Sequence, residues 1–220
     1  MMNKRVLLLC GHYGSGKTNI AVNLAQAIKK EYPIVTLADL DIVNPYFRSK
    51  DSATDLEEAG IRLICSNYAN SNVDIPALPS DLYALTDDRR MRTVIDIGGD
   101  DRGALALGRL APSILEENDY EMLMVINCYR PLTRDAASTV EVMREIEGAG
   151  GIRFTALVNN SNLGVETTAK DILASVSYAN EVASLSGLPV IMTTVDERLQ
   201  EELKDDILNL FPLKLQKKIQ

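Results

Sequence analysis

A glycine-rich stretch near the N-terminus has the composition needed to hold a phosphate group. Residues 11–18 read Gly-His-Tyr-Gly-Ser-Gly-Lys-Thr and fit the pattern G-x-x-x-x-G-K-[ST]. In this pattern, glycines let backbone N–H groups converge on phosphate oxygens, the lysine reaches the β- and γ-phosphates, and the last hydroxyl binds Mg²⁺. We therefore predict a nucleoside triphosphate site formed by Gly11, His12, Tyr13, Gly14, Ser15, Gly16, Lys17, Thr18 and Asn19.

Acidic residues stand at the ends of two later apolar segments. Residues 39–41 read Asp-Leu-Asp, and residues 96–99 read Asp-Ile-Gly-Gly. In a parallel sheet these strand ends open on the same rim as residues 11–18, here called the phosphate loop. Mg²⁺ takes hard oxygen ligands there, often through its own waters. We predict metal ligands at Thr18, Asp41 and Asp96.

The same rim contains the groups that hydrolysis of a triphosphate requires. Lys17 and Mg²⁺ would neutralise phosphate charge, while a carboxylate of Asp39 or Asp41 would orient the attacking water. The backbone N–H of Gly99 would contact the γ-phosphate, so that its loop senses the nucleotide state. No activating residue in cis is evident, and we expect slow hydrolysis without a partner.

Strand-length apolar runs alternate with segments of helical period along the chain. The expected strands are 6–10, 33–38, 61–65, 93–97, 122–127, 155–159 and 189–192. The expected helices are 17–30, 53–59, 134–147, 167–184 and 197–210, with Thr133 capping the third. Nearly uninterrupted apolar strands linked by helices indicate a three-layer α/β fold, with a mainly parallel sheet flanked by helices. We expect one nucleotide-binding domain over residues 1–220.

Three less regular parts of the chain give weaker signals. Residues 66–90 lack periodicity, which indicates an excursion on the ligand side or part of an interface. Residues 130–133, Arg-Pro-Leu-Thr, predict a structural turn near the nucleotide base. The tail 203–220 predicts a packed surface helix with a frayed end, although Pro212 interrupts it.

Composition argues against several classes of function. The net charge of −8, without a dense basic block, does not favour nucleic-acid binding. No apolar run reaches the length of a membrane span, and the N-terminal run is too short for a signal peptide. We therefore expect a cytoplasmic protein that does not bind membranes. The three cysteines form no CxxC pair, so neither a disulfide framework nor a zinc site is indicated.

Together these motifs resemble the MinD/ParA/Mrp group of P-loop ATPases, which carry the CobQ/CobB/MinD/ParA nucleotide-binding domain. The likeness rests on residues 11–18, 39–48 and 96–99 and, more weakly, on 158–160. It implies ATP and Mg²⁺ as cofactors, Lys17, Thr18 and Asp96 at the phosphates and metal, and Asp39 and Asp41 as the switch I acids. It also implies a protein client and a nucleotide-dependent homodimer.

Two positions bear on how far this resemblance extends. Asn159 resembles the asparagine that binds adenine in the family, and residues 159–162 lack the guanine-reading pattern Asn-Lys-x-Asp. That favours ATP over GTP, and it counts against the nickel-insertion GTPases, whose phosphate loop is also similar. The family's signature lysine, which reaches across the dimer, is replaced here by His12, the only histidine in the chain. A protonated His12 could donate to a phosphate oxygen.

These observations favour a Mg-dependent ATPase that acts as a nucleotide-gated switch on a protein client. Two alternatives stay open. An ATP-dependent small-molecule kinase or ligase would bind its acceptor near residues 66–90, and that acceptor would accelerate ATP turnover. A nucleotide-binding regulator would bind ATP tightly and hydrolyse none.

Overall fold

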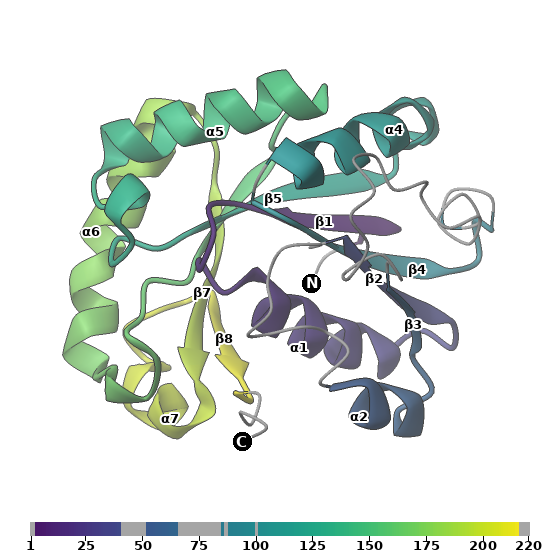
Figure 1. The fold of residues 1–220 in the computed structure, drawn as a ribbon. Helices are drawn as coiled ribbons and strands as arrows, with labels where there is room; N and C mark the ends of the chain where they lie inside the picture. The colour runs from purple at the N-terminus through teal and green to yellow at the C-terminus, as the bar shows by residue number, and fades with distance from the viewer. Residues whose placement is uncertain (1–2, 41–51, 66–84, 86–87, 100, 216–220) are drawn as a thin grey trace.

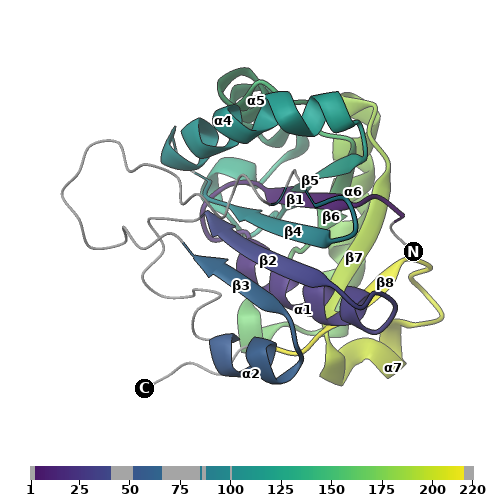
Figure 2. The same cartoon turned by 90° about the vertical axis from the view of Figure 1, so that its right-hand side faces the viewer.

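A sheet of eight parallel strands forms the frame of the molecule. The computed structural model describes residues 3–40, 52–65, 85, 88–99 and 101–215. Within them the strands lie side by side in the order β3-β2-β4-β1-β5-β6-β7-β8, and Figure 2 shows the β3-β2-β4-β1 half. Their bounds are β1 Val6–Cys10, β2 Val35–Leu40, β3 Arg62–Cys65, β4 Arg92–Ile97, β5 Tyr120–Ile126, β6 Ala156–Asn159, β7 Val190–Asp196 and β8 Leu210–Leu213.

Helices cover both faces of this sheet, as Figure 1 shows. One face carries α4 (Asp101–Glu117), α5 (Ala136–Gly150) and α6 (Ala169–Ser186). The other carries α1 (Lys17–Lys29) and α2 (Ala53–Glu58), while α7 (Gln200–Leu203) packs near β7. The described residues also form the single-turn 3₁₀ helices η2 Pro131–Thr133, η3 Gly164–Glu166 and η4 Glu197–Leu199. The predicted three-layer α/β fold is confirmed.

The apolar strand residues explain why the sheet lies between two layers. All five residues of β1 are buried, and successive side chains point to opposite faces. Leu8 packs into the core under α4, α5 and α6, while Leu9 packs against Ile20 and Leu24 of α1. A strand that is apolar on both faces is stable only when both faces are covered, as they are here.

Helix ends are fixed by local hydrogen bonds, and α5 begins and ends later than the predicted helix 134–147. The cap of α5 is Asp135, whose carboxylate accepts from the N–H of Ser138, so the assignment of Thr133 as the cap was wrong. The Thr133 hydroxyl instead donates to the carbonyl of Asn127 at 2.8 Å. It therefore stabilises the turn after β5 and not the helix.

The C-terminal part differs most from the prediction. The expected helix 197–210 is reduced to η4 and the four residues of α7, and the expected tail helix is replaced by β8. β8 pairs in parallel with β7, with Phe211 in register with Thr194 and Pro212 with Val195. Proline lacks an N–H donor but is tolerated at the edge of a sheet. Burial of Phe211 and Leu213 against the core holds the segment there.

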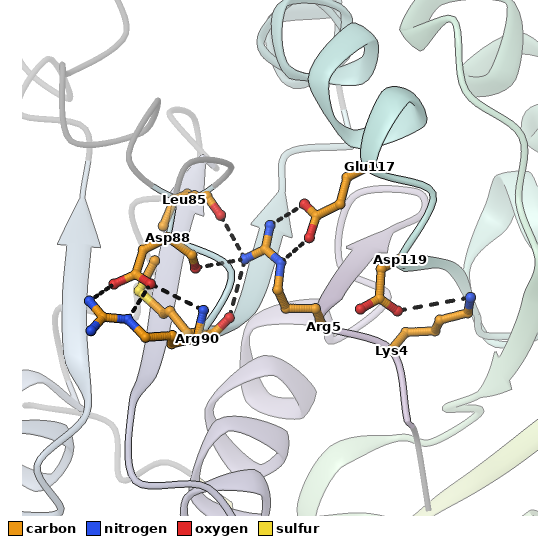
Figure 3. A network of polar contacts seen from close by, with 8 residues as sticks. Lys4, Arg5, Leu85, Asp88, Arg90, Glu117 and Asp119 are labelled. Carbon is orange, nitrogen blue, oxygen red and sulfur yellow. Dashed lines mark hydrogen bonds and ion pairs between the residues drawn. The ribbon is translucent and has the colours of Figure 1, made fainter.

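A buried ion pair holds together the edge of the sheet at which the strands begin (Figure 3). Arg5, just before β1, pairs with Glu117 at the end of α4. Its guanidinium also donates to the carbonyls of Leu85 at 2.9 Å and Met91 at 3.2 Å. Leu85, Asp88, Arg89 and Arg90 are the only described residues of the predicted excursion 66–90.

In the described part of the chain, no helix is long and apolar enough to cross a membrane.

Candidate functional site

The glycine-rich segment connects β1 to α1 and needs glycine for its backbone shape. Gly16 begins α1 in the left-handed region, with φ 91°. A Cβ at Gly11 would lie 2.4 Å from the carbonyl oxygen of Val125, so only glycine allows the loop to lie so close to β5. The result is a loop at the N-terminus of a 13-residue helix, where backbone N–H groups favour an anion.

Polar side chains inside this loop are placed for a ligand. Lys17 and Thr18 are buried, and the Lys17 ammonium donates to the carbonyl of His12 over a long 3.4 Å. No carboxylate among the described residues pairs with Lys17. The Ser15 hydroxyl is buried and has no hydrogen-bond partner within the described chain. A phosphate group would supply acceptors for both side chains, so the loop fits the predicted anion.

Two of the predicted acids lie on adjacent strands beside the loop. Asp39 of β2 and Asp96 of β4 are register partners, and Asp96 is also in register with Leu9. All three therefore point to the α1 face, and both carboxylates are buried. Two carboxylates this close repel each other unless a cation or proton intervenes. Asp41 lies outside the described residues.

These donors suit Mg²⁺ better than a metal held by a full set of protein ligands. The Thr18 hydroxyl and the carboxylates of Asp39 and Asp96 are hard oxygen donors on one face of the sheet. No group of three His, Cys, Asp or Glu residues positioned to hold a metal occurs in the described ranges. Mg²⁺ keeps several of its waters and needs few protein ligands, so the residues present fit this ion.

The turn after β4 contacts the phosphate loop directly. A Cβ at Gly99 would lie 2.3 Å from the carbonyl oxygen of Gly11 and 2.8 Å from the backbone nitrogen of Tyr13. Only a residue without a side chain permits this approach. A displacement of one loop would therefore displace the other. A loop that senses the nucleotide state requires such a contact.

His12 is half-buried in the loop, and its surroundings disfavour the protonated imidazole. Burial, followed by the charges of Lys17 and Arg130, lowers the pKa of His12 below its ordinary value of 6.5. The neutral imidazole is therefore favoured at pH 7 in this state. The adjacent Tyr13 is exposed. His12 thus differs from a lysine at the same position, which would be charged at every physiological pH.

Asn160 joins the loop to the far side of the sheet, and the sequence prediction missed it. Its amide donates to the carbonyl of Ser15 at 2.5 Å and accepts from the hydroxyl of Thr194 at 2.5 Å. A Cβ at Gly16 would lie 2.2 Å from the same amide nitrogen. The only signal in the sequence was its position at the end of a strand, next to Asn159.

Asn159 lies inside the molecule, behind this connection. It is fully buried, and its amide donates to the Ser175 hydroxyl at 2.9 Å and accepts from the N–H of Ser161 at 3.2 Å. A cavity of about 20 Å³ lies nearby and is lined by residues that include Asn160, Asn162, Thr167, Thr194 and Asp196. It holds about one water molecule, so a base could enter only if its walls moved.

Comparisons with known proteins agree on the fold. No protein-family model matches the chain, and no curated protein matches its sequence. FtsY from Thermotoga maritima is 20% identical with a TM-score of 0.57, covering 88% of this chain and 62% of that one. FtsY from Mycoplasma mycoides is 16% identical with a TM-score of 0.55, covering 89% and 61%. The signal recognition particle 54 kDa protein from Aeropyrum pernix K1, solved with GDP, is 19% identical with a TM-score of 0.51.

These similarities have a defined reach. The match to the Aeropyrum protein covers 86% of this chain but only 41% of that protein. This chain also spans less than two thirds of either FtsY. At such identities the likeness shows a shared architecture. It supports the P-loop class in general and does not single out the MinD/ParA family. The chain therefore has the P-loop NTPase fold that FtsY and the 54 kDa protein also have.

Proposed function

We propose that this chain binds ATP with Mg²⁺ at residues 11–18, hydrolyses it slowly and uses it as a switch that acts on a protein client. The observation that carries the proposal is the interior of the loop. The Ser15 hydroxyl is buried there without a hydrogen-bond partner within the described chain, and the buried Lys17 ammonium makes one long contact, to the His12 carbonyl, and pairs with no described carboxylate. Glycines keep side chains out of the same space, and an oxyanion completes the set.

The acids of β2 and β4 supply the second half of the proposal. Mg²⁺, when bound, would neutralise charge on the β- and γ-phosphates. Thr18 and Asp96, together with Asp41, would hold the ion or its waters. Asp39, the register partner of Asp96, is placed to orient a water near the same phosphates. The Gly99 N–H would then report the presence of the γ-phosphate through its contact with the loop.

The identity of the base is proposed from what the chain lacks. Guanine presents two adjacent N–H donors that a carboxylate reads well, and residues 159–162 lack the Asn-Lys-x-Asp pattern that provides one. Asp196, which lines the small cavity, is already paired with Arg198 at 2.8 Å. Asn159 is fully buried and bonded to Ser175, so its amide would reach adenine only if the surrounding side chains moved. The GDP in the Aeropyrum protein makes GTP the necessary comparison.

Calorimetry with ATP and GTP, in Mg²⁺ and in EDTA, tests this function directly. We expect ATP to bind more tightly than GTP, and Mg²⁺ to tighten binding of the triphosphate. Lys17→Ala should weaken ATP binding by about tenfold or more, because a charge-assisted contact to phosphate is lost. Lys30→Ala removes the same charge from an exposed position at the end of α1 and serves as the matched control.

The outcomes separate the competing functions. If Lys17→Ala binds ATP as the wild type does, the proposed site is wrong. Stronger binding of GTP would reject the choice of base and leave the phosphate site standing. Phosphate release measured alongside should be slow; its absence with tight ATP binding would indicate the non-hydrolysing regulator.

A further inference from the structure

Arg130, which follows β5, lies against the phosphate loop, whereas the sequence predicted only a structural turn near the nucleotide base at residues 130–133. A Cβ at Gly14 would meet the Arg130 side chain, 3.4 Å from Nε, 3.5 Å from Cζ and 3.8 Å from Cδ. The guanidinium therefore covers the middle of the loop. Gly14 leaves room for it, with φ 73°.

Local hydrogen bonds fix the backbone that presents this side chain. The Arg130 N–H donates to the carbonyl of Asn127 at 3.1 Å, and the Arg130 carbonyl accepts from Thr133 at 3.1 Å. Pro131 follows at the first position of η2 and restricts the turn further. Cys128 donates from its backbone to the hydroxyl of Ser161, next to the Asn160 connection. The side chain is thus held on a pre-organised turn.

The charge of Arg130 has no counterion in the described part of the chain. Its Nε is buried and has no hydrogen-bond partner there. A guanidinium stays protonated at any physiological pH, and a buried donor without an acceptor is costly. The same charge acts on His12 and contributes to its lowered pKa. An anion next to Gly14 would satisfy the guanidinium, which binds phosphate oxygens in a bidentate manner.

Building on the proposed function, we propose that Arg130 is a phosphate-binding residue that contacts the α- and β-phosphates of the nucleotide. The strand order places it. β4, with the metal-binding acid, lies on one side of β1, while β5 and Arg130 lie on the other, toward the cavity between β6 and β7. In the proposed function the γ-phosphate lies on the first side, with Mg²⁺, and the base lies on the second, so Arg130 would face the phosphates between them.

The test compares Arg130→Gln, Arg130→Lys and Arg134→Gln by calorimetry with ADP and with ATP, both in Mg²⁺. Arg134 is four residues further on, with a side chain that is 80% exposed, and its loss removes the same charge from outside the site. Arg130→Gln should weaken ADP and ATP by a similar factor of about 10. Arg130→Lys should recover part of that loss, and Arg134→Gln should bind as the wild type.

Each result is decisive for either the residue or the site. An unchanged affinity of Arg130→Gln, or a loss confined to ATP, would overturn the assignment of Arg130 while leaving the nucleotide site intact. If the wild type and Arg134→Gln bind no nucleotide, the proposed function fails and this inference fails with it. The unliganded Arg130→Gln should unfold at the wild-type temperature, and its His12 pKa should rise because one nearby cation is gone. A lower unfolding temperature with an unchanged His12 pKa would indicate a structural role and overturn the assignment.

Discussion

At the scale of single residues, the pKa of His12 reports the charges around the phosphate loop. Burial and the charges of Lys17 and Arg130 lower its pKa, so the unfolded chain takes up this proton first as the pH falls. His12 therefore lowers the stability of the fold as the pH drops through 6.5, and has no such effect well above it. We predict that ADP or ATP raises the His12 pKa, because phosphate charge opposes that of the two cations.

Proton NMR can check this prediction without an assignment problem, since the chain has only one histidine. The imidazole signal should titrate below pH 6.5 in the free protein and at a higher pH with saturating ADP. Lys17→Ala provides the control, because it removes one cation and should raise the pKa without nucleotide. A pKa that nucleotide leaves unchanged would mean that the phosphates do not lie beside His12.

At the scale of elements, Arg5 and Glu117 connect the loop-bearing strand to the helix that follows the Gly99 turn. Both side chains are buried, at 4% and 9% exposure. Removing one partner of such a pair leaves the other buried without its counterion. We predict that Glu117→Gln lowers the free energy of unfolding by about 3 kcal/mol, measured by urea denaturation.

Figure 3 also shows the matched control for that experiment. Lys4 and Asp119 form an ion pair at 3.9 Å a short distance away, with side chains 43% and 45% exposed. Asp119→Asn removes the same charge but should cost less than about 1 kcal/mol, because water screens an exposed pair. If the two variants lose the same free energy of unfolding, burial of the Arg5–Glu117 pair does not determine its contribution to stability.

The same scale shows which features the sequence could predict. The loop and its flanking elements follow from local information: an apolar run, glycines and a helix start are contiguous. Asp39 and Asp96 were also predictable, because parallel strands end at one rim. Asn160 and Arg130 were not, since their contacts with Ser15 and Gly14 exist only once the strand order is known.

The C-terminal error has a different origin. Apolar residues between 203 and 213 are spaced in a way that suits a helix, and local spacing favoured that assignment. Pairing with β7 and burial of Phe211 override it, as tertiary contacts commonly override a weak local preference. The prediction of a turn after β5 was likewise correct. The contact of its Arg130 with Gly14 could not be predicted, because the two residues are far apart in the sequence.

At the scale of the whole molecule, charge is distributed unevenly. The chain carries a net charge of −8 and would repel a polyphosphate at long range. Lys17 and Arg130, whose charges both act on His12, concentrate positive potential at one loop. Binding of an anion there must therefore depend on short-range contacts, and nucleotide affinity should fall less steeply with salt than it does for a basic protein.

The predicted nucleotide-dependent homodimer is a property of the whole surface and is tested by mass. Tyr13 of the phosphate loop and Leu132 of η2 expose large apolar side chains that a second copy could cover. We predict that a slowly hydrolysed ATP analogue doubles the mass seen by light scattering, whereas ADP and Lys17→Ala leave it unchanged. Two copies that each carry a net charge of −8 repel each other, so about 0.15 M salt should favour the dimer over low salt.

A constant mass despite calorimetric binding of the analogue would mean that the switch acts on a different protein as a single chain. If His12→Ala still dimerises, the imidazole does not play the part of the signature lysine of the MinD/ParA/Mrp ATPases.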